Sequence, residues 1–581
     1  MSNNNSSTET DFLSSYIQFR QHLEGLWNDL SNVEKGTRFA ELVSKTLSTQ
    51  EDFSGLKATS TQHSYDQGID MYWTDIDTNK QKILCQSKYS IYQKDDFDGI
   101  ISKFQAFESN ASNTNKPEKK QLNLLSQVED IPETDFHYYI ATLSDLSLIL
   151  QKYSQSNLAS VSFYEKLKSS RRITVVDGEK LYQIFLSAYR KEVVLPQKIE
   201  FKSVGSIVSH ENVHVGIMSA SELVRIYKNS GEGIFFENVR DFIGLGKSDS
   251  LQINNEIFKT AKDKPQKMLE RNNGITFKAK KLSIEEDHLI VLEQAGIING
   301  CQTTACVFQA NPQDNCFIVF KVVETEDEED SLTIAKTANT QNKIEKINLE
   351  LSEYIRPQIL RIALVEAGME AQDPNSPTVP SLASTIALKK VFKSDLRYLF
   401  IALFSNKPRN TFRSDYALIR FEELGKTCPT LEDKKKLVVL LARLLQISSQ
   451  VLESLRTKET SEEAQNKVLK IFKRFFEEKT GYKAYITVVG ICCFLGISSE
   501  EEYRKKDIGD LIDCISNALN NEEIKYQEVL AKAFKAVAVS ATTKFSGKEK
   551  SLDDELSQGL HSFMQDTSFD TFYSTYGIMS L

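Results

Sequence analysis

The chain has 581 residues, 40% of them hydrophobic and 26% charged, so it is long enough for roughly two to four domains. The mean hydropathy of -0.35 and the lack of any run of about 18 uncharged apolar residues argue against an integral membrane protein. The formal net charge of -9 argues against a protein that coats nucleic acid without specificity, although a local basic groove stays compatible with it.

The amino-terminal sequence "MSNNNSSTETDF" is polar and lacks the basic and apolar parts of a secretory signal. We therefore expect a cytoplasmic protein without a membrane partner. The eight cysteines show no C-x-x-C spacing, and Cys492 and Cys493 lie in the apolar run "ITVVGICCFLG". Reduced thiols in hydrophobic cores are the favoured interpretation, ahead of a metal site or disulfides.

The first part of the chain predicts an α/β domain over residues 11–192. Apolar residues recur every three or four positions in "FLSSYIQFRQHLEGLWNDL" and "FAELVSKTL", which indicates two helices. "MYWTDI", a turn at "DTNKQ" and "KILCQSKY" predict a β-hairpin. A polar loop with Pro117 follows, and "DFHYYIATLS" and "RRITVVDG" then predict two strands, each followed by a helical stretch.

A second α/β domain is predicted over residues 193–348, and a helical region over 349–581. The strands expected in the second domain are "SVGSIVS", "VHVGIMS", "GITFKAKKLSI", "HLIVLE" and "CFIVFKVVE", followed by an acidic loop and the helical start "SLTIAKTANTQNKI". Beyond it "KKKLVVLLARLLQISSQVLESL", "NKVLKIFKRFFEEK" and "IGDLIDCISNALNN" have helical periodicity, and no fixed-period repeat is present. The expected architecture is α/β, α/β and then a bundle of helices.

Three polar residues near the hairpin suggest a metal site. Gln86 and Lys88 stand two apart at the end of an apolar strand, so both side chains project to one side. Asp70, which opens the preceding strand, is the expected partner. Asp70 would anchor Mg2+ or Mn2+, Gln86 and the backbone carbonyl of Ser87 would complete the ligand set, and Lys88 would orient or help deprotonate a water.

The ordered segments "GTRFAELVSKTL", "DQGIDMYW" and "ILCQSKYS" resemble the Mrr-type branch of the PD-(D/E)xK restriction endonuclease superfamily over about the first 190 residues. The resemblance implies a metal-dependent endonuclease in which a glutamate of the preceding helix joins the site. The corresponding residue here is Glu41, although Ala40 separates it from the phenylalanine that this glutamate usually follows. Such nucleases often pair their sites on two strands, and we therefore expect a homodimer.

Four polar patches rich in asparagine lie between the later apolar strands: "FFENVRDFIG", "ERNNGITF", "GIINGCQTTACVF" and "AKTANTQNKI". Amides, hydroxyls and glycines suit recognition of phosphates, sugars or base edges. Each residue alone has a simpler role in a turn or at a helix amino terminus, but four patches in one region favour a shared pocket. The candidates for its lining are Arg240, Arg271, Asn272, Asn273, Asn299, Gln302, Thr303, Asn339 and Gln341.

The same four patches resemble the AIPR family, which is named for abortive-infection phage resistance, over about residues 200 to 350. This resemblance implies a bacterial antiviral protein and does not identify what the region senses. A nucleotide or a nucleic-acid phosphate is the ligand that we expect, and a phage-derived trigger is also considered.

Taken together, the sequence predicts a defence nuclease that cleaves nucleic acid, with DNA favoured, while the AIPR region senses or regulates. Two other interpretations stay open. One is a noncatalytic regulator that binds nucleic acid or a nucleotide, in which the amino-terminal domain is only a scaffold. The other is a nuclease that acts on RNA.

Overall fold

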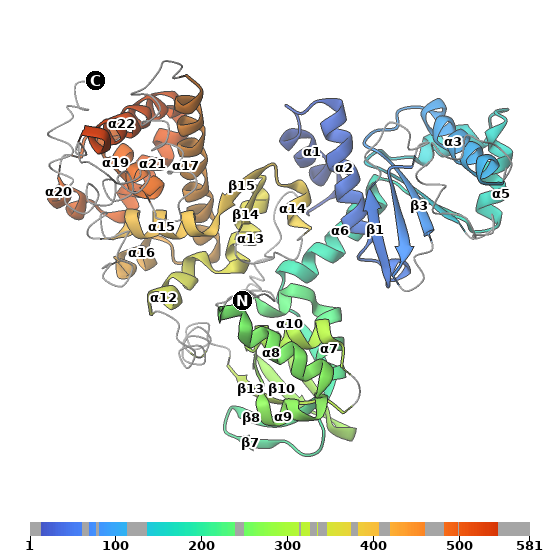
Figure 1. The fold of residues 1–581 in the computed structure, drawn as a ribbon, viewed down its shortest axis with the longest axis horizontal. Coiled ribbons are helices and arrows are strands. Elements are labelled where there is room, and N and C mark those ends of the chain that lie inside the picture. The colour runs from blue at the N-terminus through green and yellow to red at the C-terminus, as the bar shows by residue number, and fades with distance from the viewer. Residues whose placement is uncertain are drawn as a thin grey trace, which may run out of the picture. The chain divides into compact units, whose positions relative to one another are not determined.

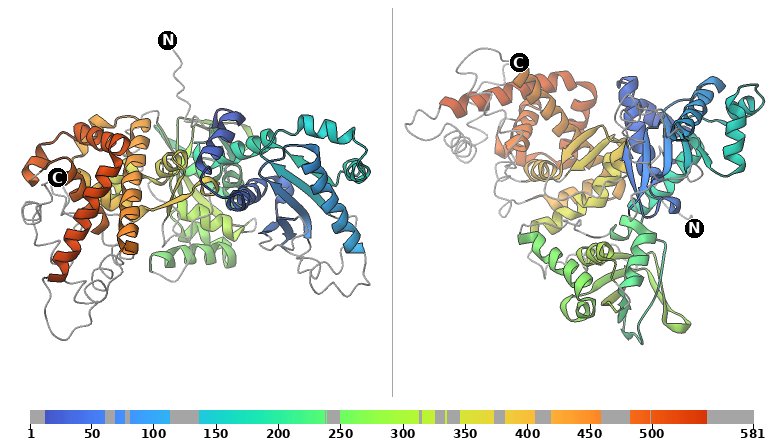
Figure 2. Two further views of the ribbon diagram at one scale, coloured as in Figure 1. Left: turned by 90° about the horizontal axis from the view of Figure 1, so that it is seen from above. Right: turned by 45° about the vertical axis from the view of Figure 1, so that its right-hand side comes forward.

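A computed structural model of the 581-residue chain describes residues 13–60, 69–76, 81–112, 136–236, 238, 249–312, 315–325, 334, 346–372, 382–405, 419–458, 482–497 and 499–543. The chain forms two compact units. Unit 1 comprises Met1–Val194 and Val379–Leu388, and unit 2 comprises Leu195–Thr378 and Lys389–Leu581. Figure 1 shows both as mixtures of helices and sheet, and Figure 2 gives two further views. The three-part division predicted from the sequence stays a prediction.

Unit 1 is built on a five-stranded sheet of order β1-β2-β3-β4-β5. Strands β2 and β3 form the antiparallel hairpin that the sequence predicts, whereas β3, β4 and β5 run parallel. The strands are β1 (Leu56–Ser60), β2 (Met71–Asp75), β3 (Gln81–Lys88), β4 (His137–Thr142) and β5 (Ile173–Val176). The carboxyl end of β3 is therefore flanked by the start of β2 and by the end of β4.

Helices pack on both faces of this sheet. Leu84 of β3 and Tyr138 and Ile140 of β4 join a core with the buried residues of the helices α3 to α5. Helix α2 packs on α6 and on β3, and α1 packs on α6. The helices are α1 (Tyr16–Leu26), α2 (Asn32–Leu47), α3 (Lys94–Ser112), α4 (Ser147–Ser154), α5 (Ser160–Ser169) and α6 (Gly178–Val193). The helices, hairpin and further strands predicted for this part of the chain are present in the predicted order, and β1, α3 and α5 are additional elements that the sequence did not predict.

Helix α2 begins at a capping box. The backbone N–H of Glu34 donates to the Ser31 hydroxyl, and the Glu34 carboxylate accepts from the backbone N–H of Ser31 at 2.9 Å. The Ser31 hydroxyl also donates to that carboxylate at 2.6 Å, and this hydrogen bond, together with the one from the Ser31 backbone, lowers the pKa of the Glu34 carboxyl group. Because the cap fixes where the helix starts, it also fixes which residues face the sheet, and Phe39, Leu42 and Val43 are buried there.

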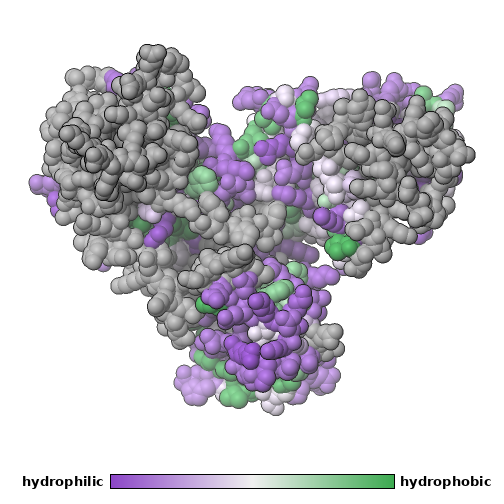
Figure 3. Space-filling view, viewed as in Figure 1, coloured by the Kyte–Doolittle hydropathy of each residue, from purple (hydrophilic) through white to green (hydrophobic). Residues whose placement is uncertain are grey.

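The first half of unit 2 contains two sheets, of order β10-β11-β6 and β12-β9-β13-β8-β7. One face of the larger sheet packs on the helices through Ile318, Phe320 and other residues of a single core. The strands are β6 (Lys198–Lys202), β7 (Val208–His210), β8 (Val213–Ser219), β9 (Ile275–Ala279), β10 (Lys281–Ile284), β11 (Leu289–Glu293), β12 (Gly296–Asn299) and β13 (Phe317–Glu324). The helices are α7 (Ala220–Ser230), α8 (Asp249–Asp263), α9 (Met268–Arg271) and α10 (Cys301–Ala310). In Figure 3 most coloured atoms over this region are hydrophilic.

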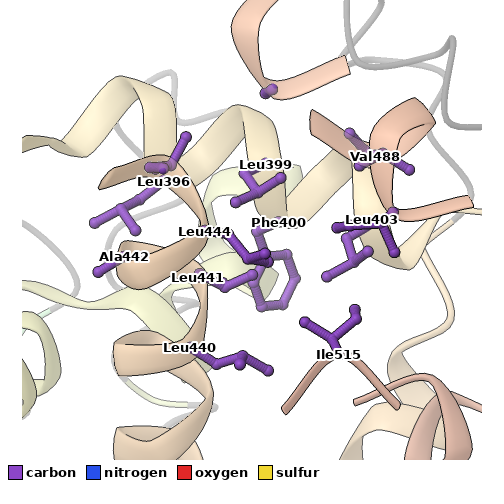
Figure 4. Packing of buried hydrophobic residues seen from close by; sticks show 14 of the residues in the cluster. Leu396, Leu399, Phe400, Leu403, Leu440, Leu441, Ala442, Leu444, Val488 and Ile515 are labelled. Carbon is purple, nitrogen blue, oxygen red and sulfur yellow. The ribbon is translucent and has the colours of Figure 1, made fainter. Parts of the chain in front are cut away.

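The second half of unit 2 is mainly helical, as predicted, with one short parallel sheet of β14 (Met369–Gln372) and β15 (Lys389–Phe392). Its helices are α12 (Lys346–Ile355), α13 (Pro357–Glu366), α15 (Lys393–Phe404), α16 (Phe421–Thr427), α17 (Leu431–Lys458), α19 (Tyr482–Phe494), α20 (Glu500–Lys505), α21 (Ile508–Asn521) and α22 (Glu523–Thr543). Phe400 lies among Leu399, Leu403, Leu441 and Leu444 in their common core (Figure 4). The predicted helical stretches at 331–344 and 466–479 lie outside the described residues, apart from residue 334.

Within the described ranges, Leu431–Leu455 of α17 is the one helical stretch long and apolar enough to cross a membrane. However, 61% of an 18-residue apolar window in this stretch is buried, which is also what the central helix of a protein core shows. Seven of the eight cysteines are buried, Cys514 is exposed, and all eight are free thiols. Burial raises the pKa of Cys306 to about 12, so this thiol stays protonated at neutral pH.

Candidate functional site

Asp70 and the end of β3 meet at one edge of the sheet in unit 1. Asp70 directly precedes β2, and its backbone N–H donates to the carbonyl of Cys85 at 2.9 Å. Since Met71 pairs with Cys85 across the hairpin, Asp70 is level with Gln86. The pairing of two neighbouring strands thus brings together residues that are 16 positions apart in the sequence.

Three donors converge on one oxygen of the Asp70 carboxylate. The Gln86 side-chain amide donates to Oδ2 at 2.7 Å, and the Ser87 backbone N–H does so at the same distance. The Ser87 hydroxyl adds a third hydrogen bond at 2.8 Å. The sequence predicted the approach of Gln86 to Asp70 but assigned Ser87 only a backbone carbonyl. Its hydroxyl was missed because strand alternation places it on the opposite face from Gln86.

The oxygen of the Gln86 side-chain amide has no hydrogen-bond partner among the described residues. Gln86 is 7% exposed, and its Oε1 is buried without a hydrogen-bond partner in the described part of the chain. A buried acceptor of this kind normally finds a donor, a water or a cation. Nearby, the Ser87 carbonyl oxygen accepts a long contact of 3.4 Å from the Gln86 amide.

The oxygen donors present fit a hard divalent cation. Asp70, Oε1 of Gln86 and the Ser87 carbonyl would supply a carboxylate, an amide and a backbone oxygen, which Mg2+ and Mn2+ accept. Among the described residues no three His, Cys, Asp or Glu side chains lie close enough to hold a metal ion. A cation here would therefore depend on the amide and carbonyl oxygens, and water would complete its coordination.

Lys88 and Glu41 belong to β3 and to the helix α2, respectively. Lys88, the last residue of β3, is exposed and forms no ion pair with any residue that the structure describes. Glu41 lies on α2, the helix that packs on β3, and its carboxylate is 3.2 Å from the Lys45 ammonium. A weaker contact of 3.8 Å joins Glu41 to Arg38. The roles assigned to Lys88 and Glu41 stay predictions.

In unit 2 the polar patches form a network of internal hydrogen bonds around α10. The Asn272 amide donates to the Thr303 hydroxyl at 3.0 Å, and its oxygen accepts from the backbone N–H of Gly274 at 2.8 Å. Gln302 accepts from the buried Asn254 at 2.8 Å. Asn254 was missed because it lies within a helical pattern, away from the four patches.

The remaining candidates of the predicted pocket are placed differently. Asn299 ends β12 and pairs with Thr276 of β9, whereas Arg271 and Asn273 are exposed. Arg271 lies 3.7 Å from the Glu270 carboxylate. The other three candidates, Arg240, Asn339 and Gln341, lie outside the described residues.

Asn238, from the first patch, is 2% exposed and donates to the Ile297 carbonyl at 3.4 Å. Of the described polar patch residues, Asn238, Asn272 and Gln302 therefore connect elements of the fold.

A family model described as AIPR protein matches residues 235–528. No curated protein and no solved structure matched the chain. The matched segment contains all four polar patches and begins at the first residue of the first one, Phe235. Because it covers more than half of the 581 residues, the chain belongs to the AIPR family, named for abortive-infection phage resistance.

Proposed function

We propose that the protein is an anti-phage nuclease in which unit 1 adopts a PD-(D/E)xK fold and hydrolyses phosphodiester bonds in nucleic acid, with DNA as the favoured substrate. Membership of the AIPR family supports the role in abortive infection. The observation that carries the nuclease assignment is the contact of the Asp70 carboxylate with the Gln86 amide at 2.7 Å. The contact lies at a sheet edge where the exposed Lys88 ends the strand.

The residues of this edge divide the expected chemistry among them. Mg2+ or Mn2+, when bound, supplies positive charge to the phosphate oxygens and acidifies a water. Asp70, Gln86 and the Ser87 carbonyl would hold the cation, and Lys88 would orient the attacking water or take its proton. The two hydrogen bonds from Ser87 to Asp70 fix the carboxylate, so that little reorganisation is needed when substrate binds.

The favoured alternative is a noncatalytic domain that binds nucleic acid or a nucleotide. It is supported by the direction of the Gln86 hydrogen bond, because the amide nitrogen points at Asp70 and satisfies the carboxylate without a metal. For catalysis the amide must rotate so that Oε1 faces the cation. An RNA substrate is compatible with the same set of residues.

Cleavage by the purified full-length protein tests these proposals. Plasmid DNA and a structured RNA are incubated with Mg2+ or Mn2+ beside the variants Asp70→Asn and Lys88→Ala. Each variant should lose at least about 100-fold in rate, as expected when a metal ligand or a proton-transfer group is removed. Lys57→Ala is the matched control, because Lys57 is an exposed lysine on β1 of the same sheet, and its rate should equal that of the wild type.

The possible outcomes separate the candidates. Cleavage that persists in both variants would assign the activity to another site and refute the proposal. Binding of either polymer without cleavage would identify the noncatalytic alternative, and cleavage of RNA alone would identify a ribonuclease. The proposed homodimer is tested separately, by the mass of the protein in solution.

A further inference from the structure

A short segment far along the chain belongs to unit 1. Residues Val379–Leu388 cluster with the amino-terminal unit, although the chain on either side of them belongs to unit 2. Its described part, residues 382–388, contains the short helix α14 (Ala383–Ile386), which packs against α2. We call residues 382–388 the strap. The strap lies within the stretch 235–528 that matches the AIPR family.

The strap is docked by apolar burial. Leu382 is 3% exposed, Ile386 is fully buried and Ala387 is 5% exposed. Thr385 is also buried, and its hydroxyl donates to the Leu382 carbonyl at 2.6 Å, so that it needs no partner outside the strap. Most of the strap's described side chains are thus removed from water. A segment that only linked two units would expose them instead.

Two polar contacts fix the orientation of the strap. The backbone N–H of Leu382 donates to the Glu192 carboxylate at 2.9 Å, near the end of α6. The Lys45 ammonium donates to the Ser384 hydroxyl at 2.9 Å. One contact is on α6 and the other on α2, and these two helices pack on each other. The strap therefore holds a helix pair rather than a single surface residue.

Lys45 connects the strap to the candidate site. Its ammonium lies between the Ser384 hydroxyl and the Glu41 carboxylate, which is 3.2 Å away, and Glu41 is the candidate metal ligand on α2. Helix α2 in turn packs on β3, the strand that ends in Gln86, Ser87 and Lys88. A displacement of the strap would therefore act on both the helix and the strand that form the site.

We propose that the strap is the intramolecular connection through which the AIPR-matched part of the chain controls the candidate site: docking holds α2 in place, and Lys45 and Ser384 act as positioning residues for Glu41. The docking does not depend on the proposed function, whereas the effect on cleavage rests on it. On the carboxyl side the strap continues directly into β15, which pairs with β14 of unit 2. Movement of this sheet would pull on the strap through the chain itself.

Three variants of the full-length protein test the proposal. Ile386→Asp places a charge at a fully buried position and should undock the strap. Ser384→Ala removes only the hydroxyl that Lys45 contacts, and Ser384→Thr keeps a hydroxyl there. Val208→Asp is the matched control, because it makes the same kind of change at a residue that is 73% exposed, on β7 of unit 2.

Hydrogen exchange of the α2 amides measures docking. Ile386→Asp should speed exchange in α2 by at least about tenfold and leave β13 unchanged, since local stability is lost only where the strap packs. Val208→Asp should change neither element. Unchanged exchange in α2 of the Ile386→Asp variant would overturn the proposed docking.

The metal dependence of cleavage measures whether the strap controls the candidate site, because a purely structural role of the strap would leave this dependence unchanged. Ser384→Ala should raise the Mn2+ concentration for half-maximal cleavage by up to about tenfold, and Ser384→Thr should restore it, as for an outer-shell contact. An unchanged metal dependence would overturn the control of the site by the strap. If the wild type cleaves no nucleic acid, the proposed function fails, and the Mn2+ affinity measured by calorimetry replaces cleavage as the readout. Equal Mn2+ affinities of the wild type and Ser384→Ala, or no Mn2+ binding, would then overturn the control of the site by the strap.

Discussion

Replacing Gly274, in the Asn-rich turn before β9, by alanine tests how closely β9 packs against β13. Its φ is +80°, and a Cβ built there would lie 2.3 Å from the backbone oxygen of Val319 on β13. Gly205 of the same unit has a φ of +81°, but a Cβ there would meet nothing within 4 Å. Alanine at Gly205 therefore carries only a conformational cost, whereas alanine at Gly274 carries a conformational and a steric cost.

The two costs can be estimated separately. A left-handed backbone costs an alanine about 1–2 kcal/mol. The overlap with Val319 cannot be relieved by rotating a side chain, because the obstructing atom is backbone, and overpacking of this kind costs about 1–3 kcal/mol. The entropy that alanine removes from the unfolded chain is similar at both positions and cancels in the comparison. Gly274→Ala should thus lower the stability of unit 2 by about 2–5 kcal/mol, and Gly205→Ala by at most about 2 kcal/mol.

The assay must report on unit 2 alone. Both tryptophans, Trp27 and Trp73, lie in unit 1, so their fluorescence during unfolding follows that unit and serves as the internal control. Hydrogen exchange of the amides in β9 and β13 gives the free energy of opening in unit 2. A difference between the two variants below about 0.5 kcal/mol would refute the close approach of β9 to β13.

Three further predictions concern unit 1. Gln86→Glu should lower the stability of unit 1 in the absence of metal, because it places a second carboxylate against Asp70. The same change should tighten Mg2+ binding about tenfold through the added ligand charge, and calorimetry would show this in comparison with Gln86→Met. Burial lowers the pKa of His137, so that as the pH falls the imidazole is protonated at a higher pH in the unfolded state than in the folded state. Unit 1 should therefore lose stability as the pH falls below about 6.5. His137→Gln should make the stability less dependent on pH, as measured by unfolding followed by tryptophan fluorescence. Arg172→Met should destabilise unit 1 by about 3 kcal/mol because it leaves the Glu108 carboxylate without its ion pair in a largely buried site, and the double variant with Glu108→Gln should recover part of that loss in the same assay.

The approach of Asp70 to Gln86 could be predicted because it depends on short-range rules. A hairpin with an apolar strand on each side sets the register, and the register brings the residue before one strand level with the end of the other. The hydroxyl of Ser87 could not be predicted in the same way. Its contact with Asp70 depends on the local direction of the chain at the strand end, where alternation of faces no longer decides which side chains meet.

Other elements lacked a recognisable pattern. Strand β1, with the sequence "LKATS", has no clear alternation, and it is defined by its pairing with β2. Strand β12 has only four residues and is followed at once by Gly300 and α10, so the sequence "GIINGCQTTACVF" indicates a polar patch rather than a strand. Gly300 has a φ of +106° and lies against Ile275, which explains the glycine by packing rather than by ligand binding.

The strap is the least predictable feature, because the residues that it contacts are far from it in the sequence. Nothing in residues 382–388 indicates a partner more than 300 positions earlier, and the separation of Lys45 from Ser384 is 339 residues. Local periodicity carries no information about pairing at that distance. A domain boundary drawn at residue 192 would therefore remove part of the buried core of unit 1 from any fragment that ends there.

The polar residues of the AIPR-matched region separate into two groups by what they contact, and the separation limits where a ligand can bind. One group forms hydrogen bonds within the fold: Asn272 bonds to Thr303, and Gln302 bonds to Asn254 of α8. A ligand that bound to these side chains would have to break contacts that hold α10 in place. Arg271 and Asn273 are exposed and flank the same turn. A ligand that leaves the fold intact would meet these two side chains first, and the internal residues would act on it only by holding the turn in shape.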